Sequence, residues 1–304
     1  MEETKHIKIA FIINPVSGPK RRKIKPKQIV SLLDKSRFDP LFFTTEYRGH
    51  ASELARNAMD AGCRIVVAVG GDGTVNEVAN TLVGTDITLG IIPFGSGNGL
   101  ARHLKIPLLW QRAVNLLNKG VITQIDSGTL SSFRFFCTCG IGFDSRIGHK
   151  FKKVDKRGFL GYLKTILKEY RDYKPRKYTF TIDGEKFERR AFIITIANAS
   201  QYGNNAFIAP KARINDGLFD VCIIKPFPRA LGLSLGIRMF NRSIQNSKYH
   251  EVIRGKVVKF KKPKKKYIFH LDGEPAKFRK SKIVATVHPA SLNVIVPARK
   301  KKSI

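Results

Sequence analysis

Apolar and polar residues follow two different rhythms along the chain, and the change falls near residue 125. In the first part, short β-branched runs alternate with segments whose apolar residues recur at helical spacing, which is typical of parallel βαβ units. The expected strands are His6–Ile13, Leu41–Thr45, Arg64–Val69 and Ile87–Ile92, and the expected helices are Lys27–Lys35, His50–Ala61 and Thr74–Val83. This pattern predicts a doubly wound α/β domain in residues 1–125 that binds ligands where its strands end.

Beyond Asp126, aromatic and β-branched runs alternate with Asp-Gly turns, as in an antiparallel sheet or sandwich. The expected strands are Phe133–Ile141, Tyr178–Ile182, Ala191–Ala197, Leu218–Ile224, Lys256–Phe260, Tyr267–Leu271 and Ile283–Val287. We place a hinge near Asn118–Ser127, a β-rich domain in residues 126–290, and a return of residues 291–304 to the first domain. The predicted fold class is therefore α/β plus all-β, with room for a nucleotide-sized cleft between the halves.

Composition narrows the choice of partners. The chain has 304 residues, 56 basic against 23 acidic, and a formal net charge of +33, which predicts attraction to a polyanion such as nucleic acid, an anionic membrane or a charged soluble ligand. The four cysteines form no CxxC pair and three of them lie in apolar runs, which favours reduced core residues. The first residues do not resemble a secretory signal, and no apolar run reaches the about 18 residues that span a bilayer.

The sharpest motif is Gly70-Gly71-Asp72-Gly73-Thr74, between an expected strand and an expected helix. Glycines let the backbone approach a phosphate closely, and the helix start adds N–H groups and a positive dipole end. Asp72 is suited to holding a magnesium ion that bridges phosphates. The structural alternative is a tight turn with a capping box, because Thr74 and Glu77 have the required spacing.

Two further loops leave expected strands at the same end of the sheet. One is Gly95-Ser96-Gly97-Asn98-Gly99, and the other is Asn14-Pro15-Val16-Ser17-Gly18. Neither contains a P-loop or a complete dinucleotide-binding fingerprint. Each on its own is compatible with an ordinary turn.

These three segments resemble, in order and spacing, the diacylglycerol kinase catalytic domain family, which is shared by bacterial lipid kinases, sphingosine kinases and ceramide kinases. The resemblance implies ATP and Mg²⁺ as cofactors and a phosphofructokinase- or NAD kinase-like first domain. It also implies nucleotide contacts by Thr45 at the end of the second strand, for which a strand-capping hydroxyl is the alternative. The expected nucleotide set is Asn14, Thr45, Gly70, Gly71, Asp72, Gly73, Thr74, Asn76, Glu77 and Ser96.

The resemblance extends into the second domain. Asn215-Asp216-Gly217-Leu218 looks like the magnesium-binding segment of the family, which implies a metal held by the Asp216 carboxylate and by carbonyl oxygens near Arg213 and Leu218. Without the family, an Asn-Asp-Gly turn explains this segment equally well.

The segment Leu271-Asp272-Gly273-Glu274 resembles the catalytic segment, which implies that Asp272 takes the proton of the acceptor hydroxyl. A hairpin turn is the alternative. The same tripeptide occurs earlier as Asp183-Gly184-Glu185, and nothing in the local sequence separates the two. We assign the role to Asp272 because the catalytic segment of the family follows the Asn-Asp-Gly segment, and we interpret Asp183 as a turn residue.

Basic residues concentrate in Lys20–Lys27, His149–Arg157, Lys164–Lys177, Lys256–Lys266 and Arg299–Lys302. Several such clusters on one face would hold a protein at an anionic membrane, although each cluster alone is also compatible with a solvated surface. Together with the family resemblance, they predict a lipid substrate and a cytoplasmic protein peripheral at the inner face of the membrane.

Two rival functions remain open from the sequence. An NAD kinase-like enzyme would share the Asp72 loop but phosphorylate a soluble hydroxyl. A basic nucleic-acid-binding protein would fit the charge, but the chain has no zinc-finger spacing or RNA-recognition motif, so no nucleic acid is expected. Diacylglycerol, a sphingoid base, ceramide and phosphatidylglycerol all remain candidate acceptors. A homodimer is compatible with the sequence, and the compact length resembles that of bacterial members.

Overall fold

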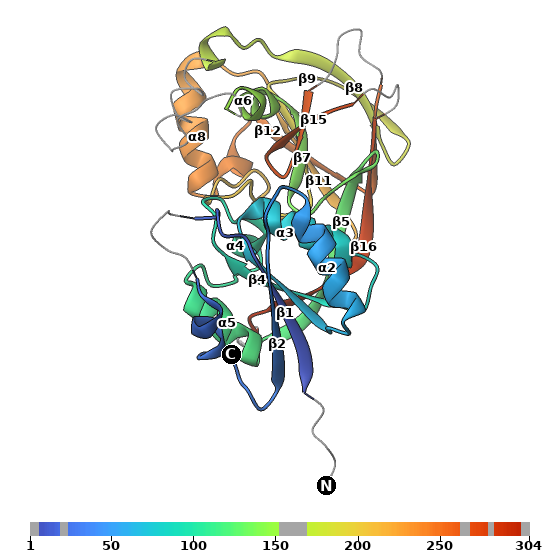
Figure 1. The fold of residues 1–304 in the computed structure, drawn as a ribbon. Helices are drawn as coiled ribbons and strands as arrows, with labels where there is room; N and C mark the ends of the chain where they lie inside the picture. The colour runs from blue at the N-terminus through green and yellow to red at the C-terminus, as the bar shows by residue number, and fades with distance from the viewer. Residues whose placement is uncertain (1–5, 19–23, 152–168, 262–267, 279–282, 299–304) are drawn as a thin grey trace, which may run out of the picture. The chain divides into compact units, whose positions relative to one another are not determined.

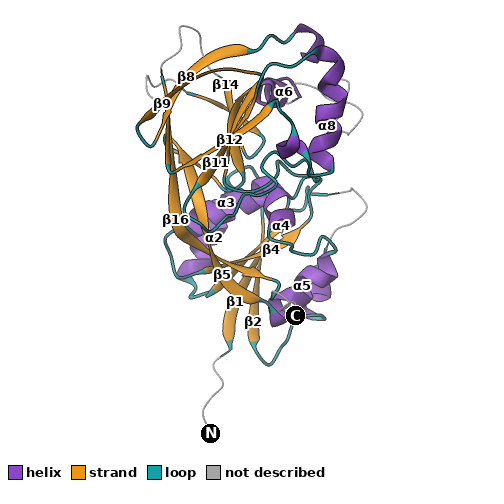
Figure 2. Ribbon diagram, turned by 180° about the vertical axis from the view of Figure 1, so that it is seen from behind, coloured by secondary structure: helices purple, strands orange, loops and turns teal. Residues whose placement is uncertain are grey.

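The computed structural model of the chain describes residues 6–18, 24–151, 169–261, 268–278 and 283–298. The chain divides into two compact units (Figures 1 and 2). Unit 1 comprises Met1–Ile125 and Ala290–Ile304, and unit 2 comprises Asp126–Pro289. All four cysteines are buried and free of disulfides, as predicted from the sequence.

Unit 1 is built on a parallel sheet with the strand order β2-β1-β3-β4. Its strands are β1 (Ile7–Ile13), β2 (Phe38–Thr44), β3 (Ile65–Gly70) and β4 (Thr88–Pro93). The last part of β16 (Ile283–Val296) extends this sheet, because Asn293 and Val294 pair in parallel with β4. Every residue of β3 and β4 is buried, which is typical of parallel strands covered on both faces.

The helices of unit 1 are α1 (Pro26–Val30), α2 (His50–Asp60), α3 (Asp72–Leu82), α4 (Gly99–His103) and α5 (Trp110–Lys119). Helices α2 and α3 pack together, α3 packs on β3, and α5 packs on β4 (Figure 1). The α/β prediction is confirmed, but α4 and α5 were not predicted. Helix α1 ends at Val30, earlier than expected, and beyond it the carboxylate of Asp34 accepts the N–H and hydroxyl of Ser36 in a turn.

Unit 2 contains an antiparallel sheet with the order β12-β11-β10-β7-β14-β15, and strands β16, β13, β8 and β9 form a second antiparallel layer. Their bounds are β7 (Thr138–Gly142), β8 (Arg176–Ile182), β9 (Glu185–Ala191), β10 (Ile193–Ala197), β11 (Phe219–Ile224), β12 (His250–Gly255), β13 (Val257–Phe260), β14 (Ile268–Leu271) and β15 (Glu274–Lys277). One core cluster draws buried side chains from both layers, among them Phe180 of β8 and Phe269 of β14. This shared core confirms the predicted β-sandwich.

Two further strands and two α-helices also contribute to the described part of unit 2. Strand β5 (Val121–Leu130) leads into β6 (Phe133–Phe135), and the helices are α6 (Phe143–Phe151) and α8 (Gly232–Phe240). Figure 2 shows both helices beside the six-stranded sheet, where they cover a second apolar cluster that includes Ile147 and Leu235. The expected continuous strand Phe133–Ile141 is wrong: it breaks into β6 and β7.

Candidate active site

The first loop of unit 1 follows β1 and is tied to helix α3. The side-chain amide of Asn14 donates a hydrogen bond to Oγ1 of Thr74 at 2.9 Å, and its oxygen accepts the N–H of Val16 at 3.1 Å. Gly18 has a φ of +81°, and a Cβ added there would lie 2.6 Å from the ring of Phe94. Only glycine permits this approach to the segment after β4.

Asp72 links the second loop, Gly70–Thr74 at the end of β3, to the third loop, Gly95–Gly99 after β4. Its Oδ2 accepts the N–H of Asn98 at 2.8 Å, and its Oδ1 accepts the N–H of Gly99 at 2.7 Å. Asn98 is left-handed with a φ of 50°, and its Oδ1 accepts the N–H of Gly95 at 3.0 Å. The carboxylate therefore satisfies N–H groups at the start of α4 that have no partner within the helix. The sequence alone did not reveal this structural role.

Glycines bring these two loops into backbone contact. A Cβ on Gly95 would lie 2.6 Å from the Cα of Gly71, and a Cβ on Gly70 would lie 2.7 Å from the Cβ of Thr74. Helix α3 begins at Asp72, immediately after this contact, so its first N–H groups lie at the loop. A helix start of this kind favours anions such as phosphate.

The expected capping box does not form. Helix α3 begins two residues before Thr74, with Gly71 as its N-cap and no side-chain cap. The hydroxyl of Thr74 instead accepts from Asn14, and the carboxylate of Glu77 accepts the N–H of Gly49 at 3.0 Å, just before α2. The capping-box interpretation was wrong because Thr74 is the third residue of the helix and not its N-cap, so its hydroxyl is not placed to cap the first turn.

The other expected nucleotide residues lie at the same strand ends. Thr45 is buried, and its N–H donates to the carbonyl of Ile13, the residue before Asn14, at 2.9 Å. Gly73 and Ser96 are exposed, and Asn76 is half-buried on α3. The structure thus gathers the first, second and third loops at one edge of the sheet, whereas Glu77 is directed to α2.

In unit 2, the 213–218 segment precedes β11. Oδ1 of Asp216 accepts the N–H of Leu218 at 3.2 Å, and Oδ2 pairs with the guanidinium of Arg254. Arg254 also contacts Asp220 at 3.2 Å, and burial raises the pKa of that carboxyl. Arg213 is exposed.

Magnesium prefers hard oxygen ligands, which this segment offers as the Asp216 carboxylate and the carbonyl oxygens around it. The donor chemistry fits the ion, and the guanidinium of Arg254 is its competitor for Asp216. Among the described residues, no group of three or more His, Cys, Asp or Glu side chains is arranged to hold a metal. Backbone carbonyls would therefore have to complete the coordination shell.

Asp272 lies in the turn between β14 and β15, with a φ of 46°. Its Oδ2 accepts the N–H of Phe136 at 2.9 Å, and its Oδ1 accepts those of Cys137 and Thr138 at 2.8 and 2.9 Å. Its own N–H donates to the carbonyl of Thr138 at 2.8 Å. These bonds fix the carboxylate and explain the break between β6 and β7, because the freed N–H groups bond to a side chain.

A buried polar cluster adjoins this turn, and little in the sequence pointed to it. Oδ2 of Asp144 contacts Nε2 of His270 at 3.0 Å, the hydroxyl of Tyr202 at 3.1 Å and the hydroxyl of Thr195 at 3.2 Å. His270 is 3% exposed, and its Nδ1 is buried without a hydrogen-bond partner among the described residues. The one available signal was an aspartate two residues after a glycine-rich buried strand, in the first turn of α6.

Comparison with known proteins identifies the family of the chain. Residues 8–130 match the diacylglycerol kinase catalytic domain, and residues 137–296 match the YegS C-terminal NAD kinase beta sandwich-like domain. A Pseudomonas aeruginosa protein named "Probable lipid kinase YegS-like" is 31% identical over 257 residues, which are 82% of each chain. The chain belongs to the diacylglycerol kinase family.

A second relative and a solved structure are also similar to the chain. A Bacillus subtilis protein named diacylglycerol kinase is 29% identical over 221 residues, covering 71% of this chain and 73% of its own. A crystal structure of a diacylglycerol kinase from Bacillus anthracis superposes with a TM-score of 0.70 at 20% identity, covering 97% of this chain and 98% of that one. That structure supports the fold.

Much of the basic sequence lies outside the described residues, including 20–23, 152–168, 262–267 and 299–304. In the described part of the chain, no helix is long and apolar enough to cross a membrane.

Proposed function

We propose that this chain transfers the γ-phosphoryl group of ATP to a hydroxyl group of a membrane lipid. The observation that carries the proposal is that the Asp72 carboxylate accepts the N–H groups of Asn98 and Gly99 at 2.8 and 2.7 Å. These hydrogen bonds hold two glycine-rich loops together at the first turn of α3. This turn would bind the triphosphate through backbone N–H groups, with Gly73 and Thr74 nearest to it. Family membership supports the choice of reaction.

Asp272 is the proposed general base. Its carboxylate would accept the proton of the lipid hydroxyl while the hydroxyl oxygen bonds to the γ-phosphorus and the bond to the β–γ bridging oxygen breaks, releasing ADP. The three N–H donors on Asp272 hold it in one orientation, which is what a positioned base requires. When bound, Mg²⁺ balances phosphate charge. Asp216, with carbonyl oxygens near Arg213 and Leu218, would hold a second, structural ion.

A labelling assay tests the proposal directly. The purified chain, γ-labelled ATP and Mg²⁺ are incubated separately with vesicles that contain diacylglycerol, sphingosine, ceramide or phosphatidylglycerol, and with NAD in solution. Label is expected in the organic phase with one lipid, and its appearance should require Mg²⁺. Label on NAD, or none with any acceptor, would refute the proposal.

A pair of glycine variants tests the nucleotide loops separately from the acceptor. In Gly95→Ala, the new Cβ would lie 2.6 Å from Gly71, so we expect a loss of roughly 1–3 kcal/mol of stability and weaker ATP binding. Gly73→Ala has nothing within 4 Å of its new Cβ and should leave thermal stability unchanged or slightly raised. If phosphate sits on the first turn of α3, Gly73→Ala still weakens ATP binding in calorimetry. Unchanged binding in both variants would place the nucleotide elsewhere.

A further inference from the structure

Helix α8 of unit 2 has two apolar faces. With about 100° between successive residues, Leu235 and Met239 fall on one side, where both pack against the apolar cluster beside the six-stranded sheet. Leu233, Ile237 and Phe240 fall together on the opposite side. They are 78%, 54% and 56% exposed. An apolar row on the solvent face of a helix is not explained by core packing.

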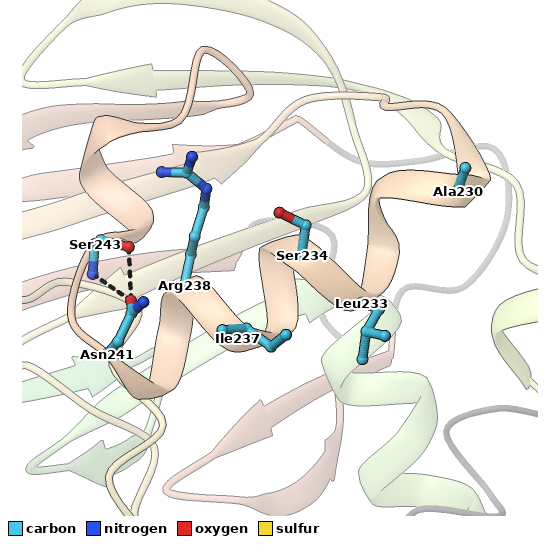
Figure 3. Close-up of a pocket in the computed structure, with 7 residues that line it drawn as sticks. All are labelled: Ala230, Leu233, Ser234, Ile237, Arg238, Asn241 and Ser243. Carbon is cyan, nitrogen blue, oxygen red and sulfur yellow. Dashed lines mark hydrogen bonds between the residues drawn. The ribbon is translucent and has the colours of Figure 1, made fainter.

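The sequence around this row is basic. From Val221 to His250 the chain has no aspartate or glutamate, but it has Lys225, Arg229, Arg238, Arg242 and Lys248. Lys225 pairs with Glu251 of β12 at 3.1 Å, so Arg238 on the helix and Arg242 at its end are the cations that bear on the row. Figure 3 shows Leu233 and Ile237 projecting on one side of α8 and Arg238 and Ser234 on the other. The guanidinium of Arg242 lies 4.3 Å from the ring centre of Phe207, which positions this charge at the end of the helix.

We propose that α8 is a membrane-docking helix whose Leu233, Ile237 and Phe240 enter the interface of a bilayer that contains anionic lipids. Apolar residues on one helix face with cations at its flanks match the interfacial helices of peripheral proteins. Charge favours an anionic bilayer over a second copy of the chain as the partner of this face. Two copies paired through α8 would bring their arginines close together, and each copy carries a net charge of +33. The inference rests on the proposed function, since a lipid acceptor lies in such a bilayer.

Vesicle flotation of the full chain tests the proposal. The wild type is expected to float with vesicles of phosphatidylcholine and phosphatidylglycerol, and much less with phosphatidylcholine alone. The triple variant Leu233→Ser, Ile237→Ser, Phe240→Ser should lower the bound fraction roughly tenfold or more. The matched control Ile122→Ser changes another exposed residue, 61% exposed on β5, and should float like the wild type.

Fluorescence gives a readout that does not depend on the triple variant folding. In a Trp110→Phe background, which removes the one native tryptophan, Phe240→Trp should be quenched by brominated lipids, and Ile122→Trp should not. Normal flotation of the triple variant, or an unquenched Phe240→Trp variant on bound vesicles, would overturn the proposal. A dimer that dissociates in the triple variant without a change in flotation would show a self-association face instead.

Activity on lipid dispersed in detergent separates this inference from the proposed function. The triple variant should match the wild type there, because its change affects docking rather than transfer. If the wild type phosphorylates no lipid but still floats through α8, the kinase proposal fails and the docking surface stands. If it phosphorylates lipid in detergent but the triple variant floats normally, only the docking proposal fails.

Discussion

Two Asp-Gly-Glu turns in unit 2 are built almost identically. Asp183 joins β8 to β9 and Asp272 joins β14 to β15, with φ angles of 49° and 46°. Asp183 accepts the N–H groups of Lys256 and Val257 at 2.8 to 3.0 Å, just as Asp272 accepts those at the break between β6 and β7. In both turns, the aspartate clamps a break between two strands.

The surroundings of the two turns differ. Asp183 is exposed, whereas Asp272 is half-buried, and its strand carries His270 in contact with Asp144 of α6. A Cβ on Gly148 of α6 would lie 3.4 Å from the carbonyl oxygen of Gly273, so the helix packs against this turn. The tripeptide therefore specifies a clamp, and neighbouring side chains must supply any further chemistry.

Exchanging each aspartate for asparagine is expected to have the largest effect. Both Asp272→Asn and Asp183→Asn remove an acceptor of backbone N–H groups, so each should cost about 1–3 kcal/mol of stability in urea unfolding. Only Asp272→Asn should also lower kcat for the lipid, by roughly a hundred- to ten-thousand-fold, because it removes the proposed base.

The stability measurement is the control for this pair, since it shows that both turns were disturbed alike. Loss of turnover in Asp183→Asn with retention in Asp272→Asn would reverse the assignment. Equal loss in both variants would show that the clamps matter only for folding.

A glycine beside each turn offers a milder test. A Cβ on Gly140 would lie 2.9 Å from Nε2 of His270 and 3.0 Å from Oδ2 of Asp144, and a Cβ on Gly255 would lie 2.8 Å from the carboxylate of Asp183. Gly140→Ala and Gly255→Ala should each destabilise the fold by about 1–3 kcal/mol. Steady-state kinetics should show kcat lowered about tenfold in Gly140→Ala alone, with KM for ATP unchanged in both. A normal kcat in Gly140→Ala would mean that the polar cluster does not position Asp272.

The smallest expected effect is on the pH dependence of stability. It sharpens the comparison of the two turns, because a loss of folded protein at low pH would also lower turnover and must be distinguished from the titration of Asp272. Burial, with Lys105 nearby, lowers the pKa of His103 in α4 to about 4. The unfolded chain therefore takes up this proton first, near pH 6.5, and the free energy of unfolding falls as the pH drops from about 6.5 to about 4. His103→Gln should remove ~1–2 kcal/mol of that fall, measured by urea unfolding at several pH values. The same fall in both proteins would contradict the assignment to His103.

The local pattern of apolar and polar residues was sufficient to predict the layers of the fold. It was insufficient to predict where a strand breaks or where helix α8 forms. The buried runs of β3 and β4 and the alternation in β8 were visible because they repeat with a fixed period. The break in Phe133–Ile141 was not visible, because it depends on Asp272, which lies more than 130 positions away. Helix α8 was missed in the same way, since apolar residues on both of its faces obscure the usual amphipathic pattern.

Residue order alone was enough to establish the family, the α/β and β-sandwich layers, and the three loops that leave the parallel strands at one edge. These features depend on short-range periodicity and on glycines at fixed positions. The folded chain was needed to show that Asp72 bonds to the start of α4 and that Arg254 pairs with Asp216. It was also needed to show that the aspartates of the two Asp-Gly-Glu turns accept backbone N–H groups in the same way. Hydrogen bonds between distant segments depend on how the whole chain packs, and local sequence does not encode the partner.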